Sequence, residues 1–211
     1  MAVPLDAIRA FHKAFRKDLA AMDAAAHAAA RGQGSADLVL KRYGFFNEML
    51  AWHASGEEEY VFTAMERVAP LVAEAYQRDH RGLDSLSDSL AEAVRSGDSL
   101  SILRATTAFN FFSTFHLNKE EAHLYRIFDE RVPLPEQAAI VGNISKKVPP
   151  PRFPEVVGWL FPLIGLDDRE NMIRILKQSL PPPMFEMATK LVREAIGADW
   201  PALVSRVPEL K

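Results

Sequence analysis

The chain of 211 residues contains no cysteine. Disulfides, iron–sulfur clusters and thiolate zinc sites are therefore excluded from its chemistry. It also lacks a basic block, since 25 Lys and Arg against 28 Asp and Glu give a net charge of −3. Nucleic acid is not expected as a partner, because phosphate binding needs a clustered positive surface.

Long apolar runs are missing as well. The longest, VVGWLFPLIGL at 156–166, contains a proline and falls short of the ~20 residues that a membrane-spanning helix needs. The first segment, MAVPLDAIRAFHKAF, mixes charged and apolar residues and has no uninterrupted apolar core, so it does not read as a signal peptide. We therefore expect a cytoplasmic protein without a membrane partner.

Helical patterns fill the first part of the chain, and β-hairpin signals are absent. We expect four long helices, at about 5–30, 37–65, 70–94 and 100–131, with Ser35 or Asp37 capping the second and Pro70 opening the third. Short turns between long helices imply antiparallel neighbours. The sequence thus predicts an all-α fold, with an up-down-up-down four-helix bundle at residues 1–132.

Most of the 14 prolines lie beyond Val132, where the composition changes. Between them are short amphipathic pieces, at about 135–147, 153–164, 167–180, 184–196 and 199–207. Disorder is the alternative, but the pieces carry too many large apolar groups for a solvated tail, including Trp159, Phe161 and Trp200. We predict a compact helical extension at 133–211, packed on the bundle.

One motif occurs twice, as WHASGEE at 52–58 and FHLNKEE at 115–121. Residues four apart share a helix face, so His53 projects with Glu57, and His116 with Glu120. The next residue in each copy, Glu58 or Glu121, turns about 100° away. A single motif of this kind is usually a surface pair. Two copies among aromatic residues favour a shared site.

Two further histidines, His12 and His80, lie near the middle of the helices that precede the motifs. In an antiparallel bundle the four histidines and two glutamates can reach one level of the core. Burying them there would be costly without an ion between them. Two metals bridged by both glutamates resolve this cost. Nitrogen and carboxylate ligands suit iron, manganese or zinc, and iron is favoured if open positions bind oxygen.

These residues resemble the hemerythrin-like (HHE cation-binding) domains over about residues 5–131. The resemblance implies a four-helix bundle with two iron ions, or manganese or zinc as substitutes. It also implies imidazole ligands and two bridging carboxylates: His12, His53, His80, His116, Glu57 and Glu120. The tail is loosely similar to segments that trail the hemerythrin domains of some plant iron-regulatory ubiquitin ligases. A ferritin-like site is disfavoured because only Glu120 and His123 show its Glu-x-x-His spacing.

The sequence departs from the oxygen-carrying hemerythrins at two positions. Those proteins have a histidine where Tyr76 stands and an aspartate where Glu120 stands. We expect Tyr76 to lie behind the ligands, with its hydroxyl on a bridging glutamate or a metal-bound water. His123 is a candidate for the same layer, although a structural role is favoured for it.

The resemblance implies a protein that binds or reacts with a small ligand, O2, NO or H2O2, in sensing or stress defence. The departures favour NO or H2O2 over oxygen carriage. The alternatives are a catalase-like or NO-consuming di-iron enzyme and a bundle whose metals are only structural. A protein partner could bind through the extension.

Overall fold

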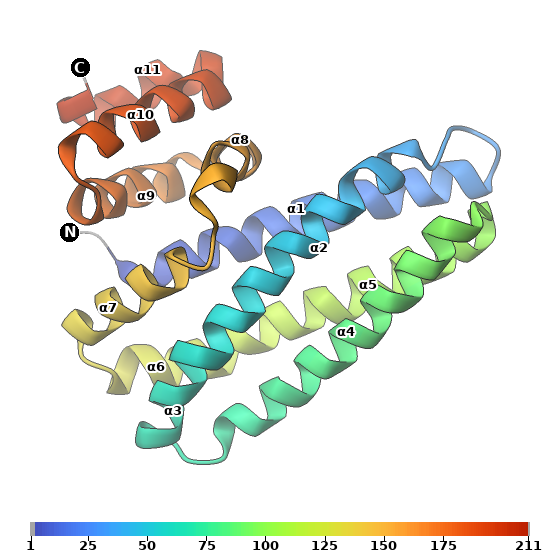
Figure 1. Ribbon diagram of the computed structural model, residues 1–211, viewed down its shortest axis with the longest axis horizontal. Coiled ribbons are helices and arrows are strands. Elements are labelled where there is room, and N and C mark those ends of the chain that lie inside the picture. The colour runs from blue at the N-terminus through green and yellow to red at the C-terminus, as the bar shows by residue number, and fades with distance from the viewer. Residues whose placement is uncertain (1–2, 211) are drawn as a thin grey trace. The chain divides into compact units, whose positions relative to one another are not determined.

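The computed structural model describes residues 3–210. Within this range every regular element is a helix, which confirms the all-α prediction of a helical bundle (Figure 1). The chain divides into two compact units, one of Phe15–Val132 and one of Met1–Ala14 with Pro133–Lys211. No helix among the described residues is long and apolar enough to cross a membrane.

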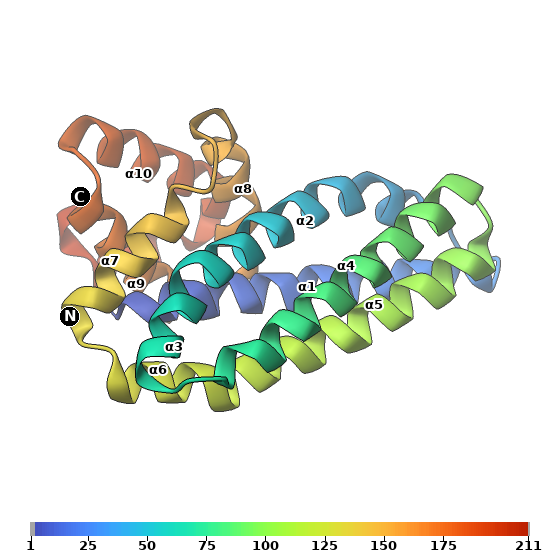
Figure 2. The same cartoon turned by 60° about the horizontal axis from the view of Figure 1, so that its bottom comes forward.

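The unit Phe15–Val132 contains the bundle. Its long helices are α1 (Pro4–Ala30, of which residues 15–30 belong here), α2 (Asp37–Gly56), α4 (Val72–Ser96) and α5 (Ser99–Lys119). Helix α2 continues through a π-helical turn, η1 (Glu57–Phe62), into α3 (Thr63–Val68). Helix α5 continues likewise through η2 (Glu120–Leu124) into α6 (Tyr125–Arg131). In Figures 1 and 2, α4 and α5 lie side by side and run in opposite directions.

The starts of the helices follow local chemistry. Asp98 caps α5 by accepting a hydrogen bond from the Ser101 N–H at 2.8 Å. The N-cap of α2 is Ala36, and Ser35 Oγ accepts the Asp37 N–H at 3.0 Å. The third helix begins near Pro70 as predicted, but Pro70 is not in its first turn, because Leu71 has a left-handed φ of 69° and α4 begins at Val72.

Aromatic packing joins the bundle helices next to the motif histidines. The ring of Phe46 on α2 lies 5.3 Å from that of Phe15 on α1 and 6.0 Å from that of Phe109 on α5, both edge-on. On the α4 side, the Tyr43 hydroxyl donates to the Ser87 carbonyl at 2.6 Å. Buried aromatic pairs and a satisfied phenol fix the helices around one core level.

The other unit is also helical. Its elements are α7 (Leu134–Ser145), α8 (Phe153–Leu163), α9 (Leu166–Ser179), α10 (Pro182–Ile196) and α11 (Trp200–Arg206), close to the predicted pieces. Buried Arg169 donates to the Phe161 carbonyl at 2.8 Å and to Asp199 at 2.7 Å, which ties three segments together. Residues 3–14 belong to this unit, and Phe11 lies 6.0 Å from Trp159. Packing of the extension on the bundle stays a prediction.

Candidate metal centre

The two motif copies lie at equivalent places in the bundle. His53 is in the last turn of α2 and His116 in the last turn of α5, while Glu57 and Glu120 are the first residues of the π-helical turns η1 and η2. All four side chains are buried, and both glutamates are fully so. π-helical turns inside α-helices are rare and frequently mark functional sites. Here each begins at a buried carboxylate.

The buried nitrogen and oxygen atoms face one another. His53 Nε2 lies 3.3 Å from Glu57 Oε2, and His116 Nε2 lies 3.3 Å from Glu120 Oε1. His80 on α4 comes between the two pairs, because its Nε2 is 3.7 Å from Glu57 Oε2 and 3.9 Å from Glu120 Oε1. Three helical segments thus direct imidazole and carboxylate atoms to one place.

Two overlapping groups of ligand atoms result. His80, His116 and Glu120 form one group, and His53 and Glu57 form the other together with Glu120; within each group the atoms lie within 4.8 Å of one another. Glu120 belongs to both. His12 is buried on α1 (Pro4–Ala30), in the part of that helix that belongs to the other unit, and its place as a ligand stays a prediction.

Carboxylates behind two of the histidines orient the imidazoles. Glu58 Oε1 lies 2.8 Å from His80 Nδ1, and Asp79 Oδ2 lies 3.4 Å from His116 Nδ1. A carboxylate accepts, so Nδ1 of each ring donates and Nε2 keeps its lone pair facing inward. This carboxylate–histidine arrangement is the one that fixes the tautomer and raises the basicity of metal-ligating histidines. The contact of Asp79 with His116 was not predicted from the sequence.

The two copies differ at the residue after the buried glutamate. Glu58 accepts from His80, whereas Glu121 pairs with Arg16 at 2.8 Å. The expectation that both turn away from the core level is met, since Glu58 is 46% exposed and Glu121 is 30% exposed. Glu58 thus contacts a candidate ligand, whereas Glu121 contacts a cationic side chain on α1.

The electrostatics of the centre favour a bound cation. Burial, and after it the charge of Glu57, raises the pKa of the Glu120 carboxyl well above its ordinary value. Burial and neighbouring His80 lower the pKa of His116 to about 4, so its imidazole is neutral at pH 7. A neutral imidazole is ready to ligate, and a cation would stabilise the ionised Glu120. The donor set therefore fits a metal bound by nitrogen and oxygen.

Apolar rings close the centre from two sides. Phe62, the last residue of η1, stacks on His80 with ring centroids 5.3 Å apart, and Phe15 meets His53 edge-on. Such surroundings keep water out and strengthen every charge interaction inside. The candidate ligands on these two sides are thus surrounded by apolar groups.

The tyrosine that contacts a candidate ligand is Tyr125, which the sequence reading missed. Tyr125 follows η2, is fully buried, and donates its hydroxyl to Glu57 Oε1. Burial and the charge of Glu57 raise the pKa of the Tyr125 phenol. The sequence repeat could have pointed to Tyr125, because the shift of 63 residues that aligns the two motifs also aligns Tyr125 with Phe62.

The prediction that the Tyr76 hydroxyl bonds to a bridging glutamate was wrong. Its ring is buried 6.4 Å from the ring of His116, but its hydroxyl lies 2.8 Å from His123 Nδ1 and 3.3 Å from the Lys119 carbonyl. The Tyr76 hydroxyl therefore bonds to residues of α5 and η2. Burial, and next the charge of Glu120, raises the pKa of Tyr76 to about 12, so it stays a protonated donor.

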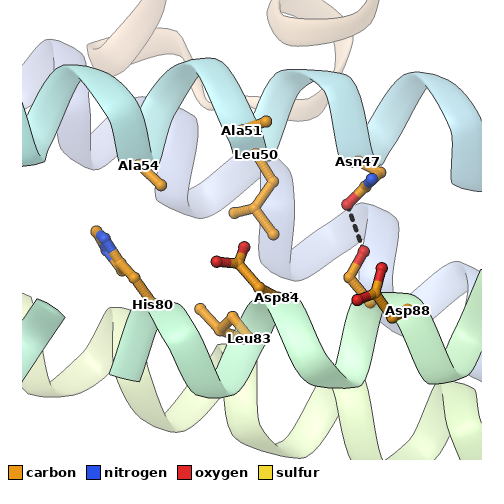
Figure 3. A pocket seen from close by; sticks show the side chains of 9 residues that line it. Asn47, Leu50, Ala51, Ala54, His80, Leu83, Asp84 and Asp88 are labelled. Atoms are coloured by element: carbon orange, nitrogen blue, oxygen red, sulfur yellow. Dashed lines mark hydrogen bonds between the residues drawn. The ribbon is translucent and has the colours of Figure 1, made fainter. Parts of the chain in front are cut away.

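A pocket of about 240 Å³ opens between α2 and α4 and has His80 in its wall. Figure 3 shows Ala51 and Ala54 on α2 facing Asp84 and His80 on α4, with the small alanine side chains leaving space beside the imidazole. At the far end Ser87 donates to Asn47 at 2.6 Å. The pocket thus lies beside one of the candidate ligands.

Comparison with known proteins identifies the family. The model of the hemerythrin HHE cation binding domain matches residues 3–127. The chain belongs to this family. The buried histidine and glutamate groups of this hemerythrin-family chain accordingly form a metal-binding site. No solved structure matches it.

Relatives of this hemerythrin-family chain occur in Arabidopsis thaliana. It is 28% identical over 178 residues to zinc finger protein BRUTUS and 23% identical over 181 residues to zinc finger protein BRUTUS-like At1g18910. Each match covers 81% of this chain, so the similarity continues beyond Val132, but only 14% of the relative. Having no cysteine, this chain supplies no thiolate for a zinc finger.

Proposed function

We propose that this protein holds two iron ions in a carboxylate-bridged centre that binds or reacts with O2, NO or H2O2, in sensing or stress defence. The observation that carries the proposal is the pair of overlapping ligand groups that share Glu120. Two groups with a common carboxylate suit two metals better than one. His12, His53 and Glu57 would serve one metal, His80 and His116 the other.

Iron is the metal of choice because the centre combines imidazoles with carboxylates and contains no cysteine ligand. When bound, a pair of iron ions supplies the redox chemistry that these side chains lack. The protein's own contribution is to orient Nε2 of His80 and His116 through Glu58 and Asp79, and to exclude water with Phe15 and Phe62. Manganese and zinc are the alternative metals.

The pocket beside His80 supports a role with small molecules over a purely structural metal site. A site that only stabilises the bundle needs no approach, and tetrahedral closed coordination is its usual form. Here Ala51 and Ala54 on α2 leave room next to His80, a candidate ligand on α4. The proposal assigns no chemistry to residues 133–211, and a protein partner for them stays a prediction.

Rapid mixing of the anaerobic ferrous protein with each small molecule tests the proposal. A spectrum that forms once and reverses when the ligand is removed would support a binding or sensing role. Repeated turnover of H2O2 or NO would support the alternative, an enzyme that consumes one of them. Iron-loaded protein that reacts with none of the three would contradict both and leave a structural site.

A further inference from the structure

Tyr125 makes the two buried glutamates unlike each other. Its hydroxyl donates to Glu57 Oε1, and both side chains are fully buried. A buried phenol needs a partner, and a buried carboxylate oxygen that accepts such a bond is satisfied by it. One of the two Glu57 oxygens is thus engaged by protein, while Oε2 is the one that faces His53 and His80 at 3.3 and 3.7 Å.

The equivalent position in the other copy has no hydroxyl to offer. A shift of 63 residues aligns Phe62 with Tyr125, and each comes five residues after the buried glutamate of its copy. Phe62 is the last residue of η1, and Tyr125 is the first residue after η2. Phe62 stacks on His80 with an angle of 28° between the rings. At this position the two halves differ by a single oxygen atom.

The ligand groups show the same asymmetry. Glu120 is common to both groups, whereas Glu57 belongs only to the group that contains His53. A carboxylate that offers two oxygens can bind one metal with each of them, whereas one that offers a single oxygen binds with that atom alone.

We propose that Tyr125 is a positioning residue that restricts Glu57 to metal binding through Oε2, so that Glu120 alone spans both metal positions with two oxygens. This inference rests on the proposed dinuclear centre and deepens it. It replaces the symmetric pair of bridging glutamates expected from the sequence with an unequal pair. The two metals would then differ in coordination although the protein supplies similar residues to each.

The test is the substitution Tyr125→Phe, which removes the hydroxyl and keeps the ring. Metal-free protein is titrated anaerobically with Fe²⁺, and the two stepwise affinities are measured together with the Mössbauer spectrum. For the native chain we expect two unequal steps and two distinct quadrupole doublets. In the variant Glu57 Oε1 loses its donor until metal binds, so the weaker step should tighten roughly tenfold, the scale of a hydrogen bond to a charged group. The two doublets should also become more alike.

A second variant guards against a packing effect of the first. Phe62→Tyr in the Tyr125→Phe background moves the hydroxyl to the other half, and the affinities should separate again. Unchanged step affinities and doublets in Tyr125→Phe, or a single doublet in the native protein, would overturn the inference while the dinuclear centre stands. Uptake of less than one iron per native chain would overturn both.

Discussion

Glu58 Oε1 lies 2.8 Å from Nδ1 of His80, on the side of the imidazole that faces away from the buried glutamates. This one contact makes an exposed residue part of the metal centre. It sets which nitrogen of His80 keeps its lone pair, and it does so from the helix that carries Glu57. Removal of such partners behind metal-ligating histidines typically costs 10–100-fold in metal affinity.

Glu58→Ala should therefore weaken metal binding by about 10–100-fold while the bundle stays folded. Equilibrium titration with Fe²⁺ under anaerobic conditions measures the change. The matched control is Glu121→Ala, which removes the residue at the equivalent place in the second motif; Glu121 pairs with Arg16. Equal losses of affinity in the two variants would show that the effect is one of net charge and not of the contact with His80.

Removing the metals should lower the melting temperature, since the folded state alone brings the ligands together. Binding only to the folded state stabilises by about 4 kcal/mol when the free ligand is a thousandfold above its Kd. For a domain of this size that corresponds to a shift of roughly 10 °C. Calorimetry of iron-loaded and chelator-treated protein measures it. Identical melting temperatures would mean that the histidines and glutamates do not bind iron in the folded chain.

Ala54→Leu should fill the pocket beside His80 and slow the reaction of the iron-loaded protein with H2O2 or NO, because Ala54 lines the pocket. The iron content should not change, since no ligand is altered. Ser55→Leu, one residue along α2 and exposed, adds the same side chain outside the pocket and should leave the rate unchanged. A rate unaffected by Ala54→Leu would show that small molecules reach the metals by another path.

Tyr76→Phe should keep both metals and leave their spectrum unchanged, because the Tyr76 hydroxyl contacts His123 and the Lys119 carbonyl and not a buried glutamate. The expected cost is about 1 kcal/mol of stability, the usual net value of a hydrogen bond. Visible spectroscopy of the ferric protein and chemical denaturation check both statements. Loss of an iron, or of a strong visible band, would show that Tyr76 is itself a ligand.

The residues of the centre could be chosen from the sequence because their spacing is a local property. His53 and Glu57 are four apart, and a helix of either the α or the π kind keeps them on adjoining faces. The extension helices were placed almost as well, since proline marks their starts. These features need no knowledge of what packs against them.

The roles of Tyr125, Tyr76 and Asp79 could not be chosen in this way. The contact of Tyr125 with Glu57 joins residues 68 apart in sequence, and that of Asp79 with His116 joins residues 37 apart. Tyr125 follows the π-helical turn η2, which shifts the phase of the residues after it, whereas the contact of Asp79 depends on how α4 packs against α5. Tyr76 lies one helical turn before His80 on α4, and its hydroxyl meets His123, 47 residues away in sequence.

The most direct test of the account is the metal content of the chain after anaerobic reconstitution with excess Fe²⁺ and removal of unbound metal. Elemental analysis together with protein quantification by amino-acid analysis gives the ratio. The account predicts two irons per chain, because two overlapping groups of buried ligands share Glu120. A ratio below one would contradict it.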